Sequence, residues 1–198
     1  MVNFKLFNKW DTTKVVVDDP GLKAYVNLNQ VLVPRSSGRN TARFWKSKNH
    51  IVERLMNKLQ VTGHKGKKHY RSSGHCTGKS ANTQNIIIKS FNLIEKKTGQ
   101  NPVQVFIKAL ENGAPREEIT TIEYGGARYP QAVDCSPQRR IDIALRQFTQ
   151  GAYNKSFGNK IKIWESLANE IINAYNIDQT SQAISKKLEL ERQADSSR

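Results

Sequence analysis

The stretch from residue 116 to residue 140 constrains the fold most, because it is the one part of the chain with clear β signals. Its first half is rich in β-branched and aromatic side chains, which pack well on a pleated surface. Gly125 and Gly126 follow, and glycine can take the positive φ angles that a tight hairpin turn requires. The segment from Tyr129 to Cys135 then returns. The pattern predicts a two-stranded antiparallel β-ribbon at about 117–135.

A single proline limits how this ribbon can pair. Pro130 has no backbone N–H, so it must lie where the ladder needs no donor, at an edge or at the start of a strand. A ribbon of two strands is only marginally stable by itself in water. We therefore expect the ribbon either to lie on a helical body or to project from such a body toward a partner.

A helix is predicted to start directly after the ribbon, at Ser136 and Pro137. The serine hydroxyl can cap free N–H groups, and proline fits the first helical turn. Arg139 and Arg140 follow in that turn, where positive charge is unfavourable against the helix dipole. Two cations at this position indicate an anion supplied from outside the helix.

Apolar residues at helical spacing account for most of the remaining chain. They predict helices at about 48–61 and 81–97, a third that starts at Asn101-Pro102, the one after Ser136, a fifth containing Ile163, Leu167 and Ile171, and a sixth capped by Ser181. Trp164 and Tyr175 are further candidates for the apolar face of the fifth helix. The predicted fold is therefore mainly α, a bundle of about six helices with a protruding two-stranded antiparallel β-ribbon.

Residues 1–47 are predicted to be a basic N-terminal extension, and residues 48–198 a single helical domain. Within the extension, Val15 to Val17 form a candidate short strand that Asp19-Pro20-Gly21 would break. The apolar side chains that follow are predicted to anchor the extension on the helical body. These are Leu22, Tyr25, Val26 and Leu28.

The charge of the chain points to a polyanionic partner. The 198 residues carry a net charge of +15, and the isoelectric point is about 9.9. Such a field favours nucleic acid first and an anionic membrane surface second. No apolar run reaches the length of a transmembrane helix, and the N-terminus lacks the apolar core of a signal peptide, so no membrane partner is expected.

Two cysteines, Cys76 and Cys135, form no disulfide framework and indicate a reduced, intracellular setting.

The first cluster of basic residues lies between residues 35 and 48, with no acid among them. The predicted RNA-binding side chains are Arg35, Arg39, Arg43, Lys46 and Lys48. Phe44 and Trp45 lie between these charges. Aromatic rings next to cations suit single-stranded or irregular RNA, in which bases stack. The same two rings could instead be buried against the first helix, and the two interpretations are compatible.

The second cluster is a predicted loop at residues 62–80, whose basic side chains suit phosphate contact. The candidates are Lys65, Lys67, Lys68 and Arg71. A phosphate-binding P-loop is a weaker alternative, because three residues separate Gly74 from Gly78 where the motif needs four, and no apolar strand precedes them. A metal site is another alternative. It would use His64, His69, His75 and Cys76, but their spacing fits no standard zinc finger or ribbon.

No catalytic arrangement is visible, so the chain is predicted not to be an enzyme and to need no cofactor or metal. Three of the four histidines lie in the glycine-rich loop, and His50 is predicted to be a helix cap or a phosphate contact. Cys135 has no obvious base beside it and is interpreted as a small buried residue. The competing hypotheses are a nucleotide-dependent enzyme built on Gly74 to Ser80 and a helical DNA-binding protein.

Several of these segments together resemble a known family, the universal small-subunit ribosomal protein seven. The resemblance covers nearly the whole chain and is carried by five segments. They are Ile51-Val52-Glu53-Arg54-Leu55, Thr98 to Val105, Ala114 to Glu118, Tyr124 to Arg140, and at the C-terminus Ala183 to Lys187 with Glu189 to Arg192 and the final Ser197-Arg198. Lys9-Trp10-Asp11 and Asp19-Pro20-Gly21-Leu22 resemble the archaeal branch, with the eukaryotic cytosolic branch second. The loop at 63–80 is longer and more basic than this family leads us to expect.

The resemblance implies a cytoplasmic, structural protein of the small ribosomal subunit that binds rRNA of the head domain and helps to start head assembly. It also implies a position near the E-site tRNA and the mRNA exit, beside ribosomal protein eleven. On this resemblance, Arg116, Arg139 and Arg140 join the rRNA-binding set. The residues placed near tRNA and mRNA are Gly125, Gly126, Arg128, Arg192 and Arg198.

Overall fold

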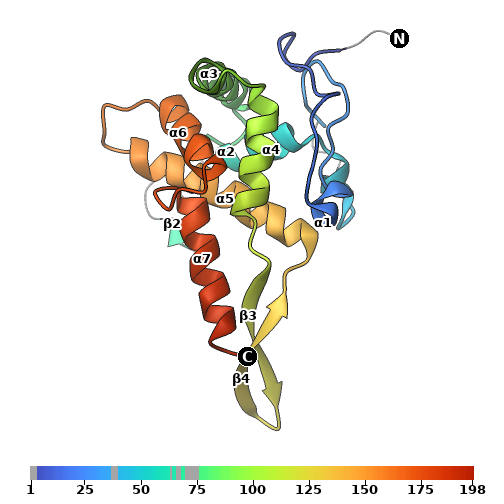
Figure 1. Ribbon diagram of the computed structural model, residues 1–198, viewed down its shortest axis with the longest axis vertical. Coiled ribbons are helices and arrows are strands. Elements are labelled where there is room, and N and C mark those ends of the chain that lie inside the picture. Colours follow the sequence, from blue (N-terminus) through green and yellow to red (C-terminus); the bar gives the residue numbers. More distant parts are fainter. Residues whose placement is uncertain (1–3, 37–39, 63, 66–67, 70–75) are drawn as a thin grey trace.

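The protein consists of a helical body from one end of which a β-ribbon projects (Figure 1). This computed structural model describes residues 4–36, 40–62, 64–65, 68–69 and 76–198. Within that part of the chain six helices have nine or more residues. They are α2 (Ile51–Leu59), α3 (Ser80–Thr98), α4 (Pro102–Gly113), α5 (Pro137–Ser156), α6 (Ile163–Tyr175) and α7 (Gln182–Asp195). The short elements are α1 (Pro20–Lys23), the 3-10 helix η1 (Trp45–Lys48), β1 (His64–Lys65) and β2 (Lys68–His69).

The ribbon is formed by β3 (Glu117–Tyr124) and β4 (Ala127–Asp134), which pair antiparallel. It leaves the body between α4 and α5, and α7 packs along the root of β3 (Figure 1). The mainly α fold with a protruding ribbon is therefore confirmed. The half of the ribbon next to the body is partly buried, and the half that carries the turn is exposed to solvent on both faces.

A row of aromatic rings crosses the core and ties the central helices together. Phe91 of α3, Phe106 of α4 and Phe148 of α5 are fully buried, with neighbouring ring centres 6.0 and 6.4 Å apart. Trp10, from the N-terminal segment, lies 5.5 Å from Phe91, and its indole N–H donates to Glu95 at 3.0 Å. Burying such rings contributes a large share of the apolar driving force of folding.

The N-terminal segment belongs to the same core. Leu6, Leu22 and Val26 are buried there, while Tyr25 and Leu28 pack against its edge. The predicted anchoring of residues 22–28 on the body is thus confirmed. The division of the chain at residue 47 stays a prediction.

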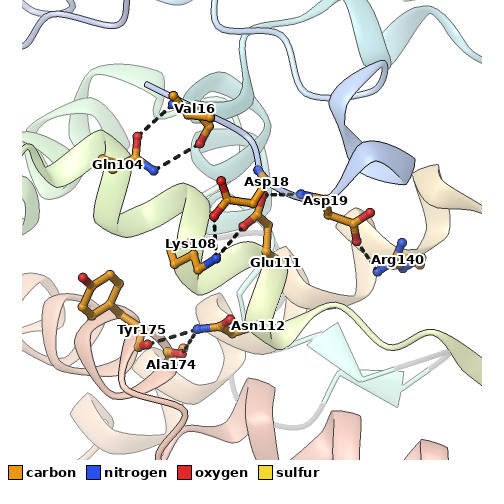
Figure 2. A network of polar contacts seen from close by, with 10 residues as sticks. All are labelled: Val16, Asp18, Asp19, Gln104, Lys108, Glu111, Asn112, Arg140, Ala174 and Tyr175. Carbon is orange, nitrogen blue, oxygen red and sulfur yellow. Dashed lines mark hydrogen bonds and ion pairs between the residues drawn. The ribbon is translucent and has the colours of Figure 1, made fainter. Parts of the chain in front are cut away.

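The predicted strand at Val15–Val17 is wrong. No strand forms there, because one α4 side chain takes the place of a partner strand: Gln104 accepts from the Val16 N–H at 2.9 Å and donates to the Val16 carbonyl at 3.1 Å (Figure 2). Asp19-Pro20-Gly21 also does not simply break the chain. The Asp19 carboxylate accepts from the Gly21 N–H at 2.8 Å and caps α1.

Two predicted serine caps are corrected by the structure. Ser136 precedes α5 and Ser181 precedes α7, but neither hydroxyl accepts from the free N–H groups of its helix. Ser181 instead donates to the buried carboxylate of Glu170 on α6 at 2.9 Å, and the same carboxylate accepts from the Gln182 N–H. A carboxylate from a neighbouring helix therefore caps α7.

His50 is a helix cap, one of the two roles predicted for it. Its Nδ1 accepts from the Val52 N–H at 3.2 Å at the start of α2, and the ring is 4% exposed. Burial lowers the pKa of His50 from 6.5 to about 4. The ring is therefore neutral in the folded protein near neutral pH.

This burial predicts an acid-dependent loss of stability. Between pH 6.5 and about 4 the unfolded chain binds a proton at His50 that the folded chain does not, so stability is complete above pH 6.5 and falls as the pH drops through this range. The expected slope from this group is at most about 1.4 kcal/mol per pH unit. His50→Asn keeps a side-chain acceptor at the cap but does not titrate. Urea unfolding at several pH values should show a steeper decline for the native chain; parallel curves would contradict the prediction.

Candidate nucleic-acid interface

The positive charge of the protein is concentrated in one part of the chain. Residues 21–94 hold fourteen of the 32 lysines and arginines but one of the 17 acids, Glu53. Residues 95–198 are nearly balanced, with fifteen basic and thirteen acidic residues. The field that attracts a polyanion therefore arises from the region that contains η1, α2, β1, β2 and the first part of α3.

The basic cluster before α2 is presented to solvent. Arg35, Arg43 and Lys48 are exposed, whereas Arg39 lies outside the described residues. Phe44 is 61% and Trp45 43% exposed, so the alternative that these rings are buried against α2 is wrong. The Arg43 guanidinium lies 5.7 Å from the centre of the Phe44 ring. The Lys48 ammonium lies 5.4 Å from that of Trp45.

This pairing of exposed rings and cations is a chemical match for unpaired nucleic acid. A base can stack on each ring, since every base has a π-face, while the adjacent cation contacts a phosphate. Each ring lies close to a cation here, because Arg43 precedes Phe44 directly and Lys48 lies three residues after Trp45, at the other end of η1. The segment that the sequence singled out for its interleaved charges and rings is therefore exposed, and its contact with RNA stays a prediction.

Lys46 is placed differently from its neighbours. It forms an ion pair with Asp142 of α5, which also receives the Arg54 guanidinium at 3.2 Å. Burial works to raise the pKa of Asp142, but the hydrogen bond from Lys46 and the charge of Arg54 outweigh it, so this pKa lies below its ordinary value. Lys46 thus serves partly to join the basic segment to α5.

Two further cations near Asp142 were missed by the sequence interpretation. Lys58 of α2 is half-buried, and burial lowers the pKa of its ammonium; Arg146, Lys46 and Arg54 lower that pKa further, while Asp142 raises it. Arg146 of α5 is exposed. Lys46, Arg54 and Lys58 act on the Asp142 carboxylate, and Arg146 acts on Lys58, so positive charge is in surplus between α2 and α5. Spacing could have revealed this, because Arg54 and Lys58, like Asp142 and Arg146, are four residues apart and share one helix face.

The second predicted basic cluster, at residues 62–80, is in part a small hairpin instead of a loop throughout. β1 and β2 pair antiparallel, with Lys65 opposite Lys68. Lys67 and Arg71 lie outside the described residues. Gly74 and His75 do as well, so the P-loop and metal-site alternatives that use them stay untested. Among the residues that are described, no three His, Cys, Asp or Glu side chains come together in a way that could hold a metal ion.

The ribbon has the predicted turn and a register that explains its proline. Gly125 and Gly126 have φ angles of +58° and +81°, which a two-residue hairpin turn of type I′ requires. Pairing runs from Tyr124 opposite Ala127 down to Glu117 opposite Asp134, with Pro130 opposite Thr121. Counted from the turn, Pro130 falls on a pair that exchanges no ladder hydrogen bonds. The prediction that Pro130 lies where the ladder needs no N–H is thus confirmed.

Alternation along the strands gives the ribbon two unlike faces. Ile122, Tyr124 and Tyr129 share one face near the tip and are 41%, 82% and 59% exposed. The opposite face carries Glu123 and Arg128, which are paired at 3.4 Å and are both largely exposed. An aromatic face on a projecting arm favours contact with bases or with apolar protein surface, while the other face remains well solvated.

The arginines at the root of the ribbon are neutralised from within the protein. Arg139 pairs with Glu118 of β3 at 2.6 Å, and Arg140 pairs with Asp19 at 2.7 Å (Figure 2). Arg140 also donates to the Pro115 carbonyl at 3.1 Å, so it joins the N-terminal segment to the residues just before β3. The predicted external anion is therefore not required at the start of α5. Arg116 is exposed. The contacts of Arg116, Arg139 and Arg140 with rRNA stay predictions.

The C-terminal candidates lie beside the same root. Arg192 on α7 is exposed, and Arg198 forms an ion pair with Glu117 at the start of β3. α7 thus covers the base of the ribbon and fixes the direction in which the ribbon projects.

Cys135 is placed and protonated as a small buried side chain. Cys135 is 7% exposed, and burial, followed by the charge of Glu118, raises the pKa of its thiol to about 11. It is therefore a protonated, buried side chain at neutral pH, as predicted, and no nucleophile. None of the helices in the described part of the chain is both long and apolar enough to cross a bilayer.

The family model described as ribosomal protein S7p/S5e matches residues 23–198. The chain belongs to this family. Among curated relatives, the small ribosomal subunit protein uS7 of Nanoarchaeum equitans is 56% identical over 198 residues, and that of Methanococcus aeolicus is 47% identical over 199 residues. Each comparison covers 100% of both chains. The resemblance inferred from the sequence is confirmed, and both relatives are archaeal. The protein is a ribosomal protein of the cytoplasmic small subunit and takes part in translation.

Proposed function

We propose that this protein binds the rRNA of the small-subunit head as a structural, non-enzymatic component and helps to start the assembly of the head. The observation that carries the proposal is the surface before α2, where exposed cations lie over the exposed rings of Phe44 and Trp45. Family membership supports rRNA as the polyanion, and the surplus charge between α2 and α5 extends the same surface.

The binding mechanism follows from this surface. Arginines and lysines from several elements neutralise phosphates of more than one rRNA helix and release condensed counterions, so affinity falls steeply with salt. The deep major groove of A-form RNA hides base edges, so recognition depends on RNA shape and on stacking at unpaired bases. A body that contacts several rRNA helices at once holds them together, which is how a single small protein can start the assembly of a larger RNA domain.

The ribbon and α7 give the finer part of the proposal. The tip, with Gly125, Gly126 and Arg128, would approach the E-site tRNA, and α7 with Arg192 and Arg198 would face the mRNA exit, beside ribosomal protein eleven. A projecting, two-faced ribbon supports this arrangement because its aromatic face can meet bases. A cleavage reagent tethered at Gly126→Cys in assembled subunits should cut bound E-site tRNA and leave P-site tRNA intact. Cleavage confined to distant rRNA would contradict the placement.

Competition between nucleic acids tests the main proposal. The labelled protein is bound to a folded rRNA head fragment and challenged with unlabelled fragment or with duplex DNA of equal phosphate content. An rRNA binder should be displaced by the fragment at concentrations at least about 1,000-fold lower than those of DNA, the lower end of the usual ratio of specific to non-specific affinity. Equal displacement by the two, or preference for the duplex, would favour the DNA-binding alternative.

A further inference from the structure

A pocket lies between α3 and the start of α6, and none of its lining residues belongs to the surface before α2 or to the cations around Asp142. Its volume is about 240 Å³, and it is lined by Lys89, Asn92, Leu93, Lys96, Trp164 and Glu165. All four α3 residues come from one face of that helix, at spacings of three and four. The pocket exists because α6 packs against α3 and leaves the outer side of the contact open.

Trp164 forms the aromatic wall of this pocket instead of joining the core. The sequence made it a candidate for the apolar face of α6, but the fully buried core residues of that helix are Leu167, Ala168, Ile171 and Ala174. Trp164 is half-buried, and the Lys89 ammonium lies 4.6 Å from the centre of its ring. The gain from burying apolar surface does not explain why so large a ring stays at the surface with a cation over its face.

Positive charge surrounds the ring. Lys89 and Lys96 are both exposed and lie two helical turns apart, about 10 Å along the axis of α3. Lys9 reaches the same edge, where its ammonium donates to the Asn92 side-chain oxygen at 3.1 Å. Glu165 is the one acid that lines the pocket, and Glu95 nearby on α3 is engaged by the Trp10 indole. The pocket therefore combines an aromatic surface with more cations than anions.

We propose that this pocket binds an unpaired rRNA nucleotide, whose base stacks on the Trp164 indole while Lys89 and Lys96 contact the flanking phosphates. The inference rests on the proposed function, because it names a second contact for the same rRNA. The flexible stem of Lys89 lets its ammonium move from the ring to a phosphate as the base takes its place. An acidic peptide segment is the other chemical candidate, but the ring offers a flat face for a base and the pocket has little further apolar surface, with Leu93 as its one aliphatic side chain.

The test compares ring removal with charge removal in the full chain. Trp164→Leu keeps apolar volume but removes the stacking face, and it should weaken binding to the folded rRNA head fragment by about tenfold, the range expected for one lost base stack. Trp164→Phe should restore most of that affinity. Lys89→Gln with Lys96→Gln should lower the slope of log affinity against log salt by about one to two.

Matched controls separate this site from general effects. Lys160→Gln with Lys162→Gln removes the same charge from the exposed loop before α6, and Phe157→Leu removes another exposed ring; both should leave affinity nearly unchanged. If the native chain binds the fragment but Trp164→Leu, with an unaltered thermal midpoint, binds equally well, the pocket inference is wrong and the proposed function stands. If the native chain itself fails to bind the fragment, the proposed function fails first. If Trp164→Leu loses binding to an acidic peptide but keeps its affinity for rRNA, the nucleotide inference is also overturned.

Discussion

Replacing Arg35, Arg39 and Arg43 together with glutamate is expected to weaken binding to a folded rRNA head fragment by roughly 100-fold near physiological salt. Arg35 and Arg43 are exposed, and Arg43 lies over the exposed Phe44 ring, so both can reach phosphates without displacing a protein contact. Loss of three phosphate contacts should also reduce the slope of log affinity against log salt by about two to three. Filter binding at several salt concentrations measures both quantities.

A control variant must carry the same change in net charge. Lys14, Lys160 and Lys162 are exposed and lie outside the basic segment of residues 21–94. Their triple replacement with glutamate also lowers the net charge by six and should reduce affinity far less. An equal loss in both triple variants would mean that only total charge matters, and the assignment of the surface before α2 would then be wrong.

Glu170→Ala is expected to destabilise the fold by about 3 kcal/mol, which corresponds to a thermal midpoint lower by roughly 6–12 °C for a chain of this size. The Glu170 side chain is fully buried. It accepts from Ser181, from the first N–H of α7 and from Lys155 at 2.7 Å. Lys155 is partly exposed and can turn to water, so most of the cost arises from the two α7 donors that lose their acceptor. Urea unfolding followed by circular dichroism gives the free energy directly.

Gly151 provides an independent check on this arrangement. A Cβ atom at this α5 position would lie 2.9 Å from the Glu170 carboxyl carbon and 3.0 Å from Gln182 Cβ. Gly151→Ala should therefore destabilise the native chain, and less so once Glu170 is alanine, since one of the two close contacts is then gone. Additive effects in this double-mutant cycle would show that the residues do not interact.

For the single variant Glu170→Ala, a destabilisation below about 1 kcal/mol would show that α7 does not depend on this carboxylate.

Features encoded by near neighbours in the chain could be predicted from the sequence. The ribbon followed from two glycines and alternating β-branched residues, and its turn angles agree. Helices followed from apolar spacing, and Asn101 caps α4 through its own side chain at 3.0 Å. Cys135 as a buried residue and the interleaving of rings and cations before α2 were likewise local patterns, whereas the exposure of those rings was left open by the sequence.

Features that depend on contacts distant in sequence could not be predicted in this way. Ser181 has the residue type of a cap, yet a carboxylate eleven residues earlier takes that role because α6 packs beside the start of α7. Arg140 looked like an anion ligand until the fold brought Asp19, 121 residues away, to its guanidinium. Lys58 and Trp164 gain their positions only from the packing of α2 on α5 and of α3 on α6.

Sedimentation of the tagged chain with ribosomal subunits in cell extract tests rRNA binding in the small subunit most directly. The native chain should migrate with the small subunit, not with the large subunit or at the top of the gradient, while the Arg35, Arg39 and Arg43 triple glutamate variant should shift toward the top. A native chain that stays at the top of the gradient under conditions in which other small-subunit proteins sediment would contradict the proposal.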